Sequence, residues 1–156
     1  MYQQPLSSSI SYPVQRVARS ARLQIQQLAK HVASLEVAVS KGEQAARAEL
    51  AWFLLDGRDG IIDRDRQRAY ELVAGQNCVD CEGVLARCLI GGYGVLKNVR
   101  EGEKLAEKSA QSGSKYGQYI WGWMLEFRRR DKAKANEYYE KASSQGLDFS
   151  HIRQQF

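Results

Sequence analysis

Apolar residues recur at helical spacing along the first quarter of the chain. Between residues 14 and 41 they stand three, four or seven positions apart, which places them on one face of a helix with Gln, Lys and Arg elsewhere. The members of this apolar face are Val14, Val17, Ala21, Ile25, Leu28, Val32, Leu35 and Val39. Gly42 follows as a helix stop. The pattern predicts one long helix over 14–41, preceded by a polar, serine-rich flexible leader over 1–13.

A second pattern begins after Gly42 and occurs three times. Stretches that start at Gln44, Val79 and Lys115 lie 35 and 36 residues apart. In each, a large apolar residue precedes a small one, and a second helical stretch follows that carries a small residue one turn from its start. The large–small pairs are Leu50–Ala51, Leu85–Ala86 and Trp121–Gly122, the later small residues are Ala69, Gly102 and Ala135, and the second stretches end at Asn77, Gly113 and Gly146. The unit is therefore helix, turn, helix, turn, over 44–78, 79–114 and 115–147, with a partial unit over 148–156.

The small residues in these units have a physical reason. Two antiparallel helices approach closely only where one of them presents Gly or Ala. One such pair cannot bury its own apolar face, so several pairs must stack. We therefore predict an all-α fold, an α/α superhelix that forms a right-handed solenoid of antiparallel helix pairs, with the long N-terminal helix capping its open end. Two local departures are expected: the second helix of the first unit is about one turn short, and the third unit lacks the Gly-rich turn after its first helix.

The net charge of +5 is concentrated near the N-terminus. Residues 1–41 hold five Lys or Arg and one acid, while residues 42–156 hold 18 basic and 17 acidic residues. Residues 1–30 contain no acid and carry Arg16, Arg19 and Arg22, a composition shared by mitochondrial and plastid transit peptides. The three cysteines, an odd number without a secretory signal, favour free thiols in a reducing compartment. We expect a cytoplasmic location, with a mitochondrial or plastid location as the alternative.

The run from Gly91 to Ser114 is the most specific motif in the chain. It combines a Gly-x-Gly-Val turn, a polar helix start, a small residue, an Ala pair and Gln-x-Gly. This run resembles the second half of a Sel1-like repeat, and the stretches around Leu50–Ala51 and Trp121–Gly122 resemble its first helix. The resemblance covers about residues 31–150. It implies a fold related to tetratricopeptide repeats and a role as an adaptor or scaffold, since members of this family are seldom catalytic.

The resemblance also implies that the first helix of each repeat lines the concave surface of the solenoid. Its outward positions carry aromatic, apolar and Arg side chains, which often anchor protein interfaces. The predicted partner-binding residues are Trp52, Arg87, Ile90, Tyr116, Tyr119, Trp123 and Phe127. The alternative is that Trp52 and Trp123 simply pack between repeats. The run Arg128, Arg129 and Arg130 is a candidate basic patch, either for phosphate or an acidic partner or as a solvated turn.

We predict no catalytic, metal or cofactor site from this sequence. Cys78-Val-Asp-Cys81 is a single CxxC pair, and neither a second pair nor a His cluster follows to complete a zinc site. The DGRDGIIDRD stretch that begins at Asp56 lacks the first ligand of a calcium loop, so its acids are expected to make a turn and cap a helix. No stretch approaches 18 consecutive apolar residues, so membrane insertion is not expected.

These observations favour a protein–protein interaction module, not an enzyme, that binds another protein or a peptide on its concave face. The alternative is a structural subunit of a larger assembly, cytoplasmic or organellar, that docks through its basic N-terminal helix. RNA binding through the two basic runs is a third class, and nucleic acid is not the expected partner. The sequence leaves open whether the chain forms homo- or hetero-oligomers through the ends of the solenoid.

Overall fold

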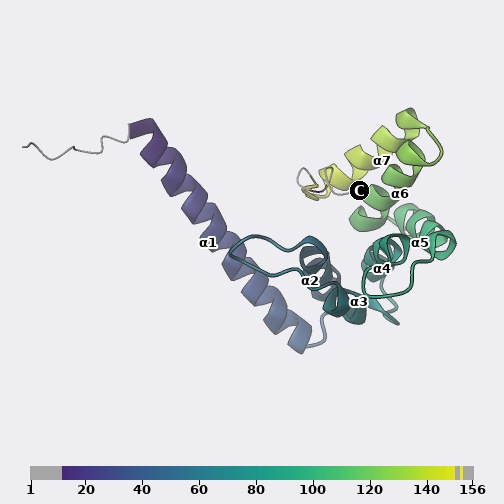
Figure 1. Cartoon of the computed structure of the whole chain (residues 1–156), viewed down its shortest axis with the longest axis horizontal. Coiled ribbons are helices and arrows are strands. Elements are labelled where there is room, and N and C mark those ends of the chain that lie inside the picture. The colour runs from purple at the N-terminus through teal and green to yellow at the C-terminus, as the bar shows by residue number, and fades with distance from the viewer. Residues whose placement is uncertain (1–11, 150–151, 153–156) are drawn as a thin grey trace, which may run out of the picture.

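The computed structural model describes residues 12–149 and residue 152, and consists of helices joined by short connections (Figure 1). The helices are α1 (Tyr12–Ser40), α2 (Gln44–Asp56), α3 (Arg66–Val73), α4 (Val79–Gly91), α5 (Val99–Gln111), α6 (Lys115–Phe127) and α7 (Lys132–Ser144). After α1 the helices form pairs, α2 with α3, α4 with α5 and α6 with α7, and the pairs stack in chain order. The predicted all-α helical-repeat solenoid is therefore confirmed.

The second helix of each pair begins at a polar side chain that caps it. The side chains of Asp65, Asn98 and Asp131 each accept a hydrogen bond from the backbone N–H three residues on, at 2.9, 3.2 and 3.1 Å respectively. Such a cap satisfies one of the backbone donors that the first helical turn leaves free. The connection between α2 and α3 thus makes a turn and a helix cap, as its acidic residues predicted.

The second helices end at residues in the left-handed backbone conformation. Gly113 and Gly146 have φ values of 93° and 82°, as predicted. In the first unit this position is Gly75, with φ 69°, and the prediction of Asn77 is wrong because α3 has only eight residues where α5 and α7 have 13 each. The third unit has no glycine after α6, and Arg130 itself takes a φ of 56°.

The predicted small residues lie where the paired helices cross. A Cβ placed on Gly102 of α5 would stand 2.9 Å from the carbonyl oxygen of Ala86 in α4. One placed on Gly122 of α6 would stand 3.2 Å from the carbonyl oxygen of Ala135 in α7. The equivalent alanine of α2, Ala51, has no exposed surface. Larger side chains at these crossings would force the paired helices apart.

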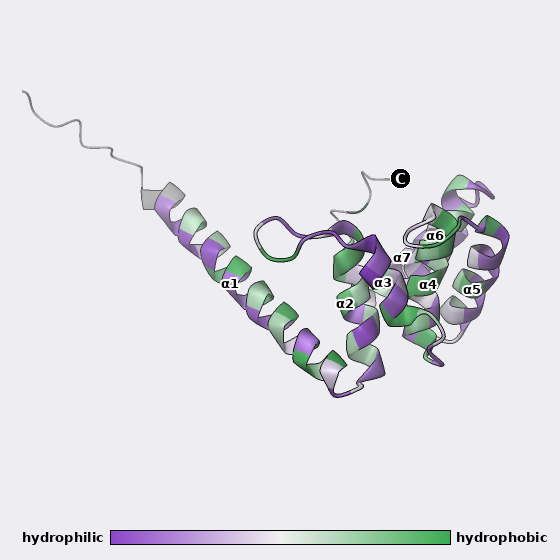
Figure 2. Cartoon of the chain, turned by 60° about the horizontal axis from the view of Figure 1, so that its bottom comes forward, coloured by the Kyte–Doolittle hydropathy of each residue, from purple (hydrophilic) through white to green (hydrophobic). Residues whose placement is uncertain are grey.

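Helix α1 caps the solenoid through its C-terminal half only. Val32 and Leu35 are buried where α1 packs on α2, whereas residues 15–27 are all exposed. Figure 2 shows this N-terminal half extending away from the repeats. The leader predicted over 1–13 lies outside the described residues, except that Tyr12 and Pro13 already belong to α1.

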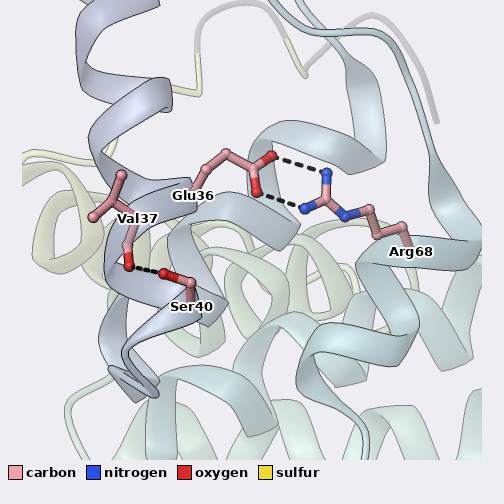
Figure 3. A network of polar contacts seen from close by, with 4 residues as sticks. All are labelled: Glu36, Val37, Ser40 and Arg68. Carbon is pink, nitrogen blue, oxygen red and sulfur yellow. Dashed lines mark hydrogen bonds and ion pairs between the residues drawn. The ribbon is translucent and has the colours of Figure 1, made fainter.

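An ion pair fixes the C-terminal half of α1 to the first repeat. The guanidinium of Arg68 in α3 donates to both carboxylate oxygens of Glu36 in α1, at 2.9 and 2.5 Å (Figure 3). The hydrogen bond to Glu36 raises the pKa of Arg68 above its ordinary value. The cap is therefore held to the body at one end by both apolar contacts and charge.

Candidate partner-binding surface

Most of the predicted partner-binding row is buried. The exposed fractions are 5% for Trp52, 2% for Arg87, 7% for Ile90, 2% for Tyr116 and 1% for Tyr119. Trp123 is half-buried, and Phe127 is 60% exposed. The expectation that the first five residues line an open surface is wrong. For Trp52 the alternative, packing between repeats, is correct.

The stacking of the first helices explains this burial. A Cβ on Gly83 of α4 would lie 2.6 Å from the backbone nitrogen of Gly117 in α6, so these helices are in close contact. The stack also curves enough to bring Trp52 of α2 against Tyr116 and Tyr119 of α6, with ring centroids 5.0 and 5.8 Å apart. Burial raises the pKa of Tyr116 well above that of an exposed phenol. The middle of the concave face is therefore filled by the protein's own aromatic side chains.

Arg87 lies at the centre of this filled face and pairs with an acid of the preceding repeat. Its guanidinium donates to the two carboxylate oxygens of Asp56 at 2.9 and 2.7 Å, and it lies over the ring of Trp52, 4.6 Å from the centroid. The side chains of Arg87 and Asp56 are 2% and 6% exposed. Charges removed from water in this way require a paired and hydrogen-bonded partner. Arg87 therefore joins two repeats through a buried ion pair.

The segment after α7 covers the neighbouring part of the concave face. The ring of Phe149 contacts those of Tyr119 and Tyr139, with centroids 4.8 and 5.7 Å apart. Leu147 is 8% exposed and Ile152 is fully buried. Residues 150–151 and 153–156 lie outside the described part of the chain, so the partial repeat over 148–156 stays a prediction.

Two members of the predicted row remain accessible at the C-terminal end of α6. The rings of Trp123 and Phe127 pack against each other, with centroids 5.4 Å apart and an interplanar angle of 35°. Arg128 and Arg130 follow them and are exposed. We call Trp123, Phe127, Arg128 and Arg130 the Trp123 edge. It combines an exposed aromatic surface with two cations.

The middle arginine of the predicted basic patch is engaged within the protein. Arg129 donates to the carboxylate of Glu103 in α5 at 2.8 Å, and its guanidinium lies 5.0 Å from the ring centroid of Trp121. All three arginines are exposed, and Arg129 also connects the end of α6 to α5, so the basic patch stays a prediction.

The structure also contains a pocket that sequence reasoning missed. It has a volume of about 220 Å³ and opens between α1, α2, α6 and the segment after α7. Its apolar walls include Leu28, Phe53 and Leu147, and Lys115 and Glu49 contribute charge. No sequence signal could have revealed it, because the walls come from four segments far apart along the chain.

The candidate chemistry in the sequence centred on its three cysteines. Cys81 and Cys88 are buried, Cys78 is half-buried, and all three are free thiols. Burial raises the pKa of Cys81 and of Cys88 to about 12, so neither is a thiolate at neutral pH. Within the described part of the chain, no three His, Cys, Asp or Glu side chains gather as a metal site would need. None of the described helices has the length and apolarity to span a bilayer.

Stacked antiparallel helix pairs with small residues at each crossing define the class of the protein as an α-helical repeat solenoid. The sequence profile of the Sel1 repeat matches residues 44–73, 83–114 and 115–147, so the chain belongs to the Sel1 repeat family. Repeats of this kind commonly serve as protein–protein interaction modules. They are typically non-catalytic.

A solved structure of a Sel1 repeat protein shares this fold. The Sel1 repeat protein from Oxalobacter formigenes is 23% identical with a TM-score of 0.50, over 76% of this chain and 36% of that one. A protective antigen of uropathogenic Escherichia coli with an SLR fold is 24% identical with a TM-score of 0.49, over 74% of this chain and 26% of that one. The chain thus spans about a third and a quarter of their respective lengths. No curated protein matches the sequence.

Proposed function

We propose that this protein is an adaptor that holds a partner protein on the concave side of its repeats, at the Trp123 edge. Helical spacing places Trp123 and Phe127 in line with Tyr116 and Tyr119, whose rings face α2. The edge therefore continues the concave face beyond the part that the protein fills with its own side chains.

The observation that carries this proposal is the exposure of Phe127. A phenylalanine that is 60% exposed and stacked on a half-buried tryptophan presents an apolar surface that water solvates poorly. Aromatic side chains beside arginine are the usual anchors of protein interfaces. The cations Arg128 and Arg130 favour an acidic rim on the partner.

The test is capture of the partner with a photo-crosslinking residue placed at Arg128, next to Phe127, in the full chain and in each variant. We expect the same partner to be lost from the variant Trp123→Ala/Phe127→Ala and retained by Leu96→Ala. Leu96 is 90% exposed and lies outside the edge, so it controls for the loss of a large exposed side chain. Equal capture by all three proteins, with the variants folded, would exclude this surface.

A second candidate function is a structural subunit that docks into a larger assembly through α1. The exposed N-terminal half of α1 favours it, because Arg16, Arg19 and Arg22 project from a segment without an acid. A cluster of one sign attracts an acidic partner and raises its association rate.

Native mass measurement on material from the source cell tests this second candidate. We expect the chain in a complex that the triple variant Arg16→Gln/Arg19→Gln/Arg22→Gln fails to enter. A free monomer under the same conditions speaks against it. Degradation of the complex by ribonuclease would instead support binding to RNA.

A further inference from the structure

The apolar face that fastens α1 to the first repeat does not stop where the repeat ends. Val32 and Leu35 are buried on α2, and the same face continues through Leu28 to Ile25 and Val17. Ile25 is 50% and Val17 70% exposed. The hydropathy colouring in Figure 2 shows green and purple positions alternating along this half of the helix. We call Val17, Ala21, Ile25 and Leu28 the open seam.

The open seam leads into the pocket beside α2. Leu28 belongs to both, and the pocket adds Phe53 and Leu147 as further apolar walls. Three turns of exposed apolar helix thus end in a hollow of about 220 Å³. This continuity gives a docked helix both a side to pack along and a place for its end.

Charge selects the kind of helix that fits. Residues 12–35 contain no acid, and Arg22 borders the open seam, while Arg16, Arg19 and Lys30 project from other sides of α1. At physiological salt the screening length is about 8 Å, close to the width of a helix, so all four cations raise the potential along the seam. A second copy of the chain would bring four more cations and no acid to the contact, which opposes self-pairing.

We propose that the open seam binds an amphipathic helix of a partner protein that carries Leu or Ile on one face and Glu or Asp on its flanks. The proposal rests on the second candidate function above and specifies which face of α1 is used and by what chemistry. The seam is narrow and has the small residue Ala21 at its middle, so it can pack closely against another helix. Binding to a bilayer surface would instead require a broad apolar face with large side chains.

The experiment uses the full chain and a synthetic 21-residue helix with Leu at core positions and Glu at the flanking positions. Binding is followed by fluorescence anisotropy of the labelled peptide. A peptide with Lys in place of Glu, anionic phospholipid vesicles and single-stranded RNA are the competing ligands. Variants Ile25→Gln and Leu23→Gln form a matched pair, because the two residues are 50% and 52% exposed and point to opposite sides of α1.

We expect the Glu peptide to bind the wild-type chain with micromolar affinity. Its affinity for Ile25→Gln should be at least tenfold lower, and its affinity for Leu23→Gln should stay within twofold of that for wild type. Arg22→Gln should weaken binding several-fold and reduce its salt dependence. Equal effects of Ile25→Gln and Leu23→Gln would overturn the proposal. Equal binding of the Lys and Glu peptides would also overturn it. The same holds if vesicles or RNA bind and the Glu peptide does not.

A failure here can be separated from a failure of the functions proposed above. If the native complex still forms with Ile25→Gln and is lost in the arginine triple variant, docking through α1 stands and the open seam is excluded. The variant Trp123→Ala/Phe127→Ala should bind the Glu peptide as wild type does, because the Trp123 edge lies on α6. Sedimentation of the chain alone detects self-association, and a dimer lost in Ile25→Gln would also overturn the proposal.

Discussion

Arg87 and Asp56 form a buried ion pair, with two hydrogen bonds of 2.9 and 2.7 Å, that connects the first helices of the first two repeats. The pair lies on the face that was expected to receive a partner. Arginine often anchors protein interfaces, but Arg87 instead connects two repeats within the fold.

Removal of Asp56 should destabilise the protein strongly. Asp56→Ala leaves the Arg87 guanidinium buried without its counter-charge, and we expect the free energy of unfolding to fall by about 3–5 kcal/mol. Urea denaturation measures this. The exposed pair Lys108–Glu82 serves as the control, since Lys108→Ala should cost at most about 1 kcal/mol. A similar small loss for Asp56→Ala would mean that the buried pair contributes little.

The crossing of α4 and α5 should not tolerate one extra methyl group. Gly102→Ala would ordinarily stabilise a helix interior by up to about 1 kcal/mol. Here the new Cβ would stand 2.9 Å from the carbonyl oxygen of Ala86, so we expect a net loss of about 1–3 kcal/mol. Lys104→Ala in the same helix is exposed and should stay within about 0.5 kcal/mol of wild type. Stabilisation by Gly102→Ala would refute the close crossing.

The buried thiols should make stability fall at high pH. Burial raises the pKa of Cys81 and of Cys88 from 9.0 to about 12, so the unfolded chain loses these protons first as pH rises. Their contribution is fully present below pH 9 and is lost between pH 9 and about 12, by up to about 1.4 kcal/mol per pH unit for each thiol. Cys88→Ala should show a shallower decline than wild type. Identical pH profiles would contradict this account.

Two residues on the same face of α1 should differ sharply in their effect on stability. Leu35 is 6% exposed, and Leu35→Ala should cost about 2–5 kcal/mol through the cavity it leaves. Ile25 is 50% exposed, and Ile25→Ala should change the free energy of unfolding by about 0.5 kcal/mol at most. Thermal or urea unfolding in dilute solution makes the comparison. Equal losses would show that the N-terminal half of α1 packs on the body.

Much of this fold can be predicted from the sequence because close helix packing restricts residue size. Ala51, Ala86 and Gly122 recur at one position of the repeat for that reason, and they mark the crossings correctly. Capping works in the same way. The Asp65 carboxylate accepts a backbone hydrogen bond at the start of a helix, and Gly113, which lacks a Cβ, adopts the left-handed conformation at the end of one.

The candidate site was harder to predict because periodicity shows which residues share a helix face, and not what covers that face. Trp52 and Tyr119 occupy the expected positions, but the curvature of the stack brings their rings together. The segment with Phe149 then covers part of the remainder. The apolar face of α1 likewise continues unchanged beyond the part that packs on α2. The sequence therefore could not show which of its residues α2 buries.

We propose above all that partner binding falls to the Trp123 edge because the middle of the concave face is filled. Isothermal titration of the captured partner against wild type and Trp123→Ala/Phe127→Ala tests it most directly. We predict at least a tenfold loss of affinity with an unchanged far-UV circular dichroism spectrum. Unchanged affinity in this folded variant would contradict the account.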